Sequence, residues 1–260
     1  SVTNAYNSGD ITADGSLIVI SAAGFAGGIV GTGIDGTTSS ISNCYNTGAV
    51  TANVGGYVGG INGHNTGTIS DCYNTGKIYA KKYYAGGITG SEYKTGTIFD
   101  CYNTGAITAD GSTVYGTTIY SYVGGIAGAL LGLPASITNA YNTGTITGAA
   151  MTGGIVGGDM GGTISKVYNT GKIISSNSRA GGISGYNATT GAVISSALYA
   201  TTDASGNSIN QNLGNNKVGT GVTYADLLKT STYTANGWTV DSSTGTVGGI
   251  DTVGVKASTW

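Results

Sequence analysis

Short apolar segments alternate with glycine and small polar residues along most of the chain. A Tyr-Asn-Thr-Gly segment, with Ser for Thr in the first copy, recurs at intervals of 39, 28, 29, 39 and 27 residues, at Tyr6, Tyr45, Tyr73, Tyr102, Tyr141 and Tyr168. Each copy is followed by a Gly-Gly-Ile-X-Gly block and then by an Ile-Ser or equivalent segment that leads into the next tyrosine. Self-similarity of this kind is typical of a repeat protein.

The apolar segments are short, rich in β-branched residues and bounded by Gly, Asn or Thr, which favours strands over helices. Three such strands in one repeat predict one turn of a parallel β-solenoid, because a single turn cannot bury its apolar face until it stacks on another. The predicted fold is all-β: a right-handed parallel β-solenoid over residues 1–199, with three short strands per turn of about 28 residues and six to seven turns.

Stacking of turns predicts columns of like residues. One inward column should hold the β-branched residue that follows each Tyr-Asn-Thr-Gly segment: Ile11, Val50, Ile78, Ile107, Ile146 and Ile173. Another should hold the isoleucines of the Gly-Gly-Ile blocks, with Ile61 and Ile88 as vertical neighbours. If these two isoleucines lie far apart, the solenoid prediction is wrong.

Two repeats are longer, and their extra residues begin in both cases with Ala-Asp-Gly-Ser. These insertions, near 13–25 and 109–122, are expected to form hairpin-like protrusions, since Asp-Gly favours a tight turn. Residues 200–260 lack the repeat and are expected to cap the solenoid; they hold Trp238, Trp260 and a short helix over 224–229 with Thr223 as its N-cap. Ser1 begins within a repeat, which suggests a piece of a longer protein or an end that stacks on another subunit.

The composition narrows the possible partners. The 260 residues include 49 Gly and 1 Pro but only 10 Lys+Arg and 12 Asp+Glu, for a net charge of −2. Nucleic acid is not an expected partner, because its affinity depends on clustered Lys and Arg. No apolar run is long enough to predict a membrane span.

The Gly-Gly-Ile-X-Gly blocks, the Ile-Ser-Asn-Cys-Tyr-Asn-Thr-Gly run at 41–48 and the stretch 227–238 resemble the GLUG repeat family. The resemblance implies a secreted or surface-attached bacterial protein; such repeats occur in adhesin-like proteins and in the non-catalytic part of some immunoglobulin A metallopeptidases. It implies no activity of its own. A His-Glu-X-X-His zinc site is impossible here, since His64 is the only histidine and Glu92 the only glutamate.

The tyrosine column is the first candidate site. The position before each tyrosine is Cys, Ala or Val and should point inward, so the tyrosines should point outward. Exposed rings could stack on sugar faces, which makes Tyr45, Tyr73, Tyr102 and Tyr141 candidate carbohydrate-binding residues. The alternative is that the stacked tyrosines only stabilise neighbouring turns.

Polar residues occupy the position two before each tyrosine, where Asp71 should lie above Asp100. A Ca²⁺ ion could relieve the repulsion of these carboxylates. They could also be an ordinary solvated pair or, less favourably, an acid pair for glycan cleavage. A polysaccharide lyase would need a base and neutralising cations in one groove, which the sequence does not indicate. No catalytic residue and no cofactor other than Ca²⁺ are predicted.

Two further columns are expected to be structural. Cys44, Cys72 and Cys101 share one position with small apolar residues of other repeats, which predicts buried free thiols. The asparagine after each tyrosine should face inward, where side-chain amides can bond along the solenoid. Threonine pairs such as Thr66 and Thr68 suggest an ice-binding face, but Lys77 interrupts the flanking column.

The function predicted from these observations is a non-catalytic, extracellular structural or adhesive module of a bacterial cell surface. Its expected partners are itself, stacked head-to-tail into a surface fibre, or neighbouring surface domains. The alternative is a carbohydrate-binding module that uses the tyrosine column, and a weaker one is a polysaccharide-degrading β-helix enzyme.

Overall fold

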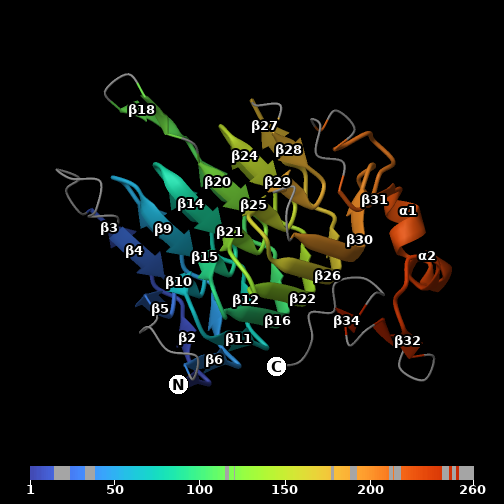
Figure 1. Cartoon of the computed structure of the whole chain (residues 1–260), viewed down its shortest axis with the longest axis horizontal. Helices are drawn as coiled ribbons and strands as arrows, with labels where there is room; N and C mark the ends of the chain where they lie inside the picture. Colours follow the sequence, from blue (N-terminus) through green and yellow to red (C-terminus); the bar gives the residue numbers. More distant parts are fainter. Residues whose placement is uncertain are drawn as a thin grey trace.

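The chain folds into a rod of stacked turns that runs across Figure 1 from β4 to β30. This structure is a computed structural model that describes residues 1–14, 24–32, 39–114, 117–119, 121–176, 179–187, 192–210, 213, 218–241, 246–247 and 250–251. Every strand of the rod pairs in parallel with the equivalent strand of the next turn. The predicted parallel β-solenoid is therefore confirmed.

The first sheet, sheet A, carries both the Ile-Ser and the Tyr-Asn segments of each turn. Its strands run in register, and from the first turn to the sixth tyrosine pairs with tyrosine and asparagine with asparagine. In the last turn Leu198 and Tyr199 take these places. The strands are β1 (Val2–Thr3), β2 (Tyr6–Asn7), β6 (Ser40–Ser42), β7 (Tyr45–Asn46), β11 (Thr68–Ser70), β12 (Tyr73–Asn74), β16 (Thr97–Asn103), β22 (Ser136–Asn142), β26 (Thr163–Asn169), β30 (Val193–Ala200) and β31 (Thr220–Val222).

Sheet B follows the Thr-Gly corner and holds the first predicted column of β-branched residues. Consecutive members of that column are register partners, as in Ile78 with Ile107, so the column is confirmed. The strands are β3 (Ile11–Ala13), β8 (Val50–Ala52), β13 (Ile78–Ala80), β17 (Ile107–Ala109), β23 (Ile146–Gly148) and β27 (Ile173–Ser175).

Sheets C and D lie before and after the Gly-Gly-Ile corner. Sheet C consists of β4 (Gly24–Gly27), β9 (Gly56–Gly59), β14 (Tyr83–Gly86), β20 (Tyr122–Gly124), β24 (Met151–Gly153) and β28 (Ala180–Gly181). Sheet D consists of β5 (Val30–Thr32), β10 (Asn62–Asn65), β15 (Thr89–Tyr93), β21 (Ala127–Leu131), β25 (Val156–Asp159) and β29 (Ser184–Asn187).

Each turn thus contributes to four sheets, one more strand than the three expected from the sequence. The chain bends sharply at Gly-Gly-Ile, so the residues before and after the bend pair separately. A Cβ on Gly63 would lie 2.8 Å from the carbonyl oxygen of Tyr57, and one on Gly59 would lie 2.7 Å from that of Ile88. Glycine at these positions therefore lets the two sheets approach backbone to backbone.

Two apolar cores run along the rod. The first lies inside sheet A and contains the isoleucines of the Gly-Gly-Ile blocks together with the cysteine column. Ile61 and Ile88 are vertical neighbours in it, with the Ile61 amide donating to the Ile88 carbonyl at 3.0 Å. The second core lies between sheets B and C and contains small residues such as Ala80 and Val58. Burial of these columns drives the stacking of the turns.

The asparagine column forms a continuous ladder of side-chain amides. Each Nδ2 donates at 2.7–2.8 Å to the Oδ1 of the next turn, from Asn7 through Asn169. The same Nδ2 donates to the carbonyl of the glycine two residues on, as in Asn74 to Gly76 at 2.8 Å. The inward, structural role predicted for these residues is therefore confirmed.

Two small elements project from the rod. Strands β18 (Ser112–Val114) and β19 (Thr117–Ile119) pair in antiparallel fashion and extend away from the sheets in Figure 1. The insertion predicted at 13–25 lies largely outside the described residues, as does Trp260. Strands β32 (Val240–Asp241), β33 (Thr246–Val247) and β34 (Ile250–Asp251) form a separate antiparallel sheet.

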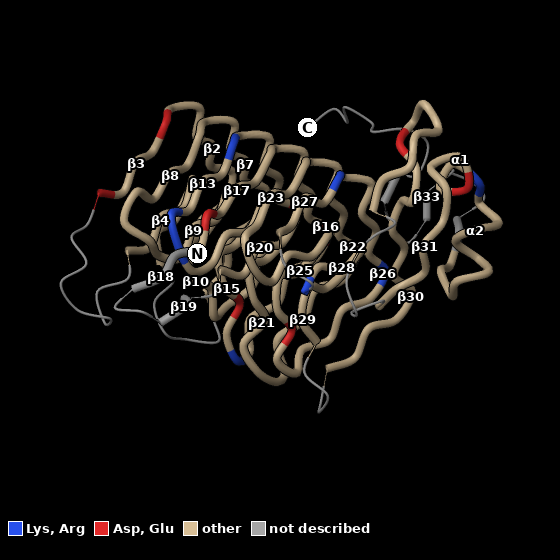
Figure 2. The backbone as a smooth tube through the Cα atoms, turned by 90° about the horizontal axis from the view of Figure 1, so that it is seen from above, with Lys and Arg blue, Asp and Glu red and all other residues tan. Residues whose placement is uncertain are grey.

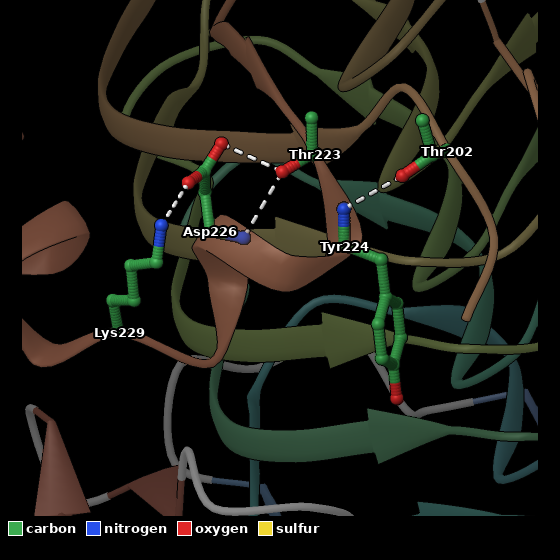
Figure 3. Close-up of polar contacts among 5 residues, drawn as sticks. All are labelled: Thr202, Thr223, Tyr224, Asp226 and Lys229. Atoms are coloured by element: carbon green, nitrogen blue, oxygen red, sulfur yellow. Dashed lines mark hydrogen bonds and ion pairs between the residues drawn. The ribbon is translucent and has the colours of Figure 1, made fainter. Parts of the chain in front are cut away.

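Beyond the last turn, two short helices pack beside sheet A: α1 (Tyr224–Leu227) and α2 (Thr230–Ala235). Thr223 caps α1 as predicted, because its hydroxyl accepts from the Asp226 amide at 3.1 Å and donates to the Asp226 carboxylate at 2.6 Å (Figure 3). Lys229 donates to the other carboxylate oxygen of Asp226 at 2.7 Å. The helix is shorter than expected, since a second helix begins at Thr230.

Candidate functional site

The tyrosine column forms a ladder of parallel rings. Consecutive ring centroids, from Tyr6 to Tyr168, lie 4.9–5.3 Å apart with interplanar angles of 1–11°. Each inner ring is therefore covered on both faces by its neighbours. The expectation that these rings offer faces for sugar stacking is wrong for the inner rings, because the stacking that joins the turns already occupies them. The ladder presents ring edges and phenol hydroxyls.

Exposure falls along the ladder. Tyr6 is 66% exposed, whereas Tyr141 and Tyr168 are only 9% and 8% exposed. These last two rings pack with Leu227, Tyr233 and other apolar residues of the C-terminal segment. Tyr141, one of the four candidate carbohydrate-binding residues, is therefore not accessible to a ligand. The other three, Tyr45, Tyr73 and Tyr102, are half-buried.

In the column beside the ladder, the preference for polar residues has a conformational cause, which sequence reasoning missed. All its members adopt positive φ, between 49° and 58°: Asn4, Asn43, Asp71, Asp100, Asn139, Lys166 and Ser196. Asn and Asp tolerate this left-handed conformation better than most residues. In the first three turns the left-handed residue separates the Ile-Ser and Tyr-Asn strands of sheet A, whereas from β16 onward it lies within one continuous strand. The prevalence of Asn and Asp at one repeat position was the available signal.

A groove of about 330 Å³ lies between this column and the tyrosine ladder. It is lined by residues of the first three turns: Asn4, Asn43, Cys44, Tyr45, Asp71 and Tyr73. The structure thus brings two candidate carbohydrate-binding residues, Tyr45 and Tyr73, together with one candidate calcium ligand, Asp71. Sequence reasoning did not assign Asn4 and Asn43 to a site. Ring edges, amides and a carboxylate in one groove can hydrogen-bond a polar, uncharged ligand.

The groove is weakly charged. Among the described residues that line it, Asp71 is the one that carries a charge. Figure 2 shows that charged residues are few and scattered over the described part of the rod. Burial raises the pKa of Tyr73, and the neighbouring Tyr45 adds to the shift. Burial likewise raises the pKa of Tyr102 to about 12. These phenols therefore stay protonated and able to donate hydrogen bonds at neutral pH.

Asp71 and Asp100 occupy adjacent turns of the left-handed column, as predicted from the repeat. Burial raises the pKa of Asp100, and Asp71 raises it further, whereas a hydrogen bond with Asn139 lowers it. Within the described residues, no group of three or more His, Cys, Asp or Glu side chains is arranged to hold a metal ion. The pair alone would give Ca²⁺ at most four of the six to eight oxygen ligands that it usually takes.

The cysteines contribute no reactive group to the groove. Cys44, Cys72 and Cys101 are free and buried, as predicted. Each thiol lies 3.0–3.2 Å from the carbonyl oxygen two residues before it. Burial raises the pKa of the Cys44 and Cys101 thiols, whereas a hydrogen bond with Cys101 lowers the pKa of Cys72. All three thiols are almost inaccessible to a reaction partner, so these residues act as small core side chains.

A second aromatic ladder, which sequence reasoning missed, runs along sheet C. Phe25, Tyr57, Tyr84 and Tyr122 stack with centroids 4.6–5.1 Å apart. His64 lies 5.5 Å from Tyr57, and its Nδ1 is 2.6 Å from the hydroxyl oxygen of Ser91. Ser91 is fully buried, so this His-Ser contact has no access to a substrate. The signal in the sequence was an aromatic residue two positions before the first glycine of four of the six Gly-Gly-Ile blocks.

These features define a parallel β-solenoid repeat protein with a polar groove on one flank. The family model described as the GLUG motif matches residues 119–147, which span one corner of sheets C and D and the next segment of sheet A. The resemblance inferred from the repeats is thereby confirmed. No curated protein and no solved structure matches the chain. Neither helix in the described part of the chain has the length and apolarity needed to cross a bilayer.

Proposed function

We propose that the chain is a non-catalytic structural and adhesive module of a secreted or surface-attached bacterial protein. The observation that carries the proposal is the continuity of hydrogen bonding: four parallel sheets and one amide ladder join each turn to the next. Such a rod resists extension and proteolysis, because its inner strands have no free edges. Its Ser, Thr, Asn and Gly surface suits an exposed position without strong electrostatic steering.

The module is also suited to continuing a longer assembly. Among the described residues, β3, β4 and β5 of the first turn each have a strand partner on one side only. Open strand edges are templates for strand addition. We therefore propose that further repeats of a longer chain, or a second copy stacked head-to-tail, pair with this turn. Analytical ultracentrifugation at rising concentration tests self-stacking, and a constant monomer mass would contradict it.

The experiment for the main proposal is localisation combined with attachment. Antibodies against the rod should label intact cells of the bacterium that produces it, and a non-adherent host that displays the rod should attach better to glycan-coated surfaces. The matched control displays a rod in which Gly87→Ala disrupts the stacking of the turns. Labelling only after cell lysis, or measurable turnover of a polysaccharide by the purified chain, would overturn the proposal.

A second candidate function, carbohydrate binding, is favoured by one specific observation. The groove brings Tyr45, Tyr73, Asn43 and Asp71 together as hydrogen-bonding groups along an apolar ring edge, an arrangement that suits sugar hydroxyls and C–H groups. A glycan array with the wild-type chain tests this function, with Tyr73→Ala as the variant. Loss of glycan retention in a variant that keeps its circular dichroism spectrum would support it; absence of any retention by the wild type would exclude it.

A further inference from the structure

Within the candidate carbohydrate-binding function, on which this inference rests, we propose that the ligand is a neutral, extended β-1,4-linked polysaccharide. It lies parallel to the rod axis, one sugar per turn, and contacts the hydroxyls and edges of the tyrosine ladder. Ring faces take no part, except at Tyr6.

The direction of the ligand follows from the direction of the repeat. The groove offers the same pair of groups on successive turns: a left-handed Asn or Asp and, two residues later, a tyrosine. These pairs repeat along the rod axis, with ring centroids 5.0–5.3 Å apart over Tyr6, Tyr45 and Tyr73. A ligand that uses equivalent contacts on several turns must therefore repeat along the same axis.

The spacing selects an extended chain of β-linked sugars. In a fully extended β-1,4-linked polysaccharide each pyranose ring advances the chain by roughly 5 Å, close to the spacing of neighbouring strands. Coiled α-1,4-linked chains change direction from one sugar to the next and cannot follow a straight row of hydroxyls. The rise per sugar thus matches the spacing of the turns. Successive sugars are rotated by about half a turn, so the tyrosines meet alternate edges of the chain, both of which carry hydroxyls.

The chemistry of the groove favours an uncharged ligand. Among the described residues no Lys or Arg lines the groove, and Asp71 would repel a uronate or a sulfated sugar. Because the faces of Tyr45 and Tyr73 are covered by neighbouring rings, the interactions left are hydrogen bonds from phenol hydroxyls and amides and apolar contact with ring edges. Burial keeps the Tyr73 hydroxyl protonated and able to donate to a sugar oxygen.

The C-terminal segment sets the length of the site. Tyr141 and Tyr168 are buried against residues of α1 and α2, so the accessible part of the ladder ends at Tyr102. Within one copy of this chain, four tyrosines remain available: Tyr6, Tyr45, Tyr73 and Tyr102. Affinity should therefore rise with each added sugar up to about four and then level off, in contrast to a site that recognises only a chain end.

Calorimetric titration of the full chain tests the proposal with purified oligosaccharides of two to six sugars. The probes are β-1,4-linked glucose and N-acetylglucosamine oligomers, α-1,4-linked glucose oligomers, and anionic β-1,4-linked mannuronate oligomers. We expect binding of at least one neutral β-linked series, an affinity plateau near four sugars, and weaker binding of the α-linked and anionic series.

Conservative variants locate the site. Tyr73→Phe keeps the ring in the ladder but removes one hydroxyl, and should weaken binding about fivefold to tenfold, the equivalent of one net hydrogen bond. Tyr84→Phe makes the same change in the ladder of sheet C and should leave binding unchanged. Thermal unfolding of both variants checks that the rod persists.

The outcomes separate this inference from the function on which it depends. Binding of α-linked or anionic oligomers in preference to neutral β-linked ones would overturn the inference and leave carbohydrate binding in place. Equal affinity for disaccharide and hexasaccharide, or equal effects of Tyr73→Phe and Tyr84→Phe, would do the same. Absence of binding to every series would overturn both.

Discussion

The side-chain amide of Asn103 lies directly on the backbone of Gly87, so close that a Cβ on Gly87 would overlap it. The same contact recurs along the rod, as between Gly60 and Asn74 and between Gly125 and Asn142. It explains why the Gly-Gly-Ile and Tyr-Asn-Thr-Gly segments occur together in every repeat. The second glycine of the first five blocks provides the flat surface on which the amide ladder packs, whereas Gly182 of the sixth block lies against the Tyr199 ring.

Gly87→Ala should therefore destabilise the rod strongly. The added methyl group would meet both the Gly125 carbonyl and the Asn103 side chain, neither of which can move without breaking a ladder. We expect the free energy of unfolding to fall by about 1–3 kcal/mol or more in urea denaturation. Gly9→Ala is the matched control, because its Cβ meets nothing closer than 3.9 Å. This variant should lower the free energy of unfolding by less than about 0.5 kcal/mol. Equal effects of the two variants would contradict the packing argument.

Asn74→Ala tests the amide ladder itself. Asn74 is fully buried, donates to Asn103 and Gly76, and accepts from Asn46. Its removal takes one hydrogen bond from each of these three partners in a dry interior, at a total cost of about 3 kcal/mol. Thr75→Ala, at the next and exposed position, should change stability little. A loss below about 1 kcal/mol in Asn74→Ala would mean that water enters and replaces the amide.

Glu92→Gln should stabilise the protein at neutral pH. Burial raises the pKa of Glu92 well above its ordinary value, against a hydrogen bond from Asn65 that lowers it. Because the folded pKa is raised, wild-type stability is highest below the unfolded pKa of about 4.3 and falls as pH increases above it. Glutamine removes this loss of stability. The free energy of unfolding of the variant should therefore exceed that of the wild type by about 1 kcal/mol or more at pH 7, and equal it near pH 4.

Denaturation curves of the wild type and of Glu92→Gln at pH 4 and pH 7 check the sign of this pH dependence. Asp226→Asn provides a control of opposite direction, since hydrogen bonds from Lys229 and Thr223 lower the pKa of Asp226. Its contribution to stability is present above the unfolded pKa and is lost as pH falls. A gain from Glu92→Gln that is as large at pH 4 as at pH 7 would show that ionisation is not the cause.

Tyr233→Ala should release the C-terminal segment from the ladder. Tyr233 is 2% exposed, meets Tyr168 edge-on at 6.3 Å, and donates to the Leu227 carbonyl at 2.8 Å. We expect a loss of about 3–5 kcal/mol in local stability, seen as faster amide hydrogen exchange in 218–241 and around Tyr141. Tyr233→Phe removes only the hydrogen bond and should cost about 1 kcal/mol. Unchanged exchange around Tyr141 in Tyr233→Ala would contradict the covering role.

Asp100→Asn should raise the melting temperature at pH 7. It removes a carboxylate whose pKa burial and Asp71 have raised, and it places at a left-handed position the residue that Asn43 and Asn139 already provide. Since the folded pKa is raised, the gain should vanish below the unfolded pKa of about 3.9. The same scans test calcium binding: the hypothesis requires millimolar Ca²⁺ to stabilise the wild type but not Asp100→Asn.

Much of the fold could be predicted because the repeat constrains it. Ile61 and Ile88 had to be vertical neighbours once equal segments were assumed to stack, and the inward position of Asn74 followed from alternation. The fourth strand per turn could not be predicted, since it depends on how closely the sheets meet across Gly59 and Gly63. The residues of the groove were only partly foreseen: Tyr45, Tyr73 and Asp71 were singled out separately, and their meeting with Asn4 and Asn43 was not.

The amino-acid sequence by itself determined which residues share a column, because a repeated segment gains its hydrogen bonds and its apolar contacts only when like residues stack. The tertiary structure decided what each column can offer. Stacking of neighbouring rings covers the faces of Tyr45 and Tyr73. Residues far away in the sequence, such as Tyr233, bury Tyr141. Exposure depends on distances between segments far apart in the chain, which a local pattern does not contain.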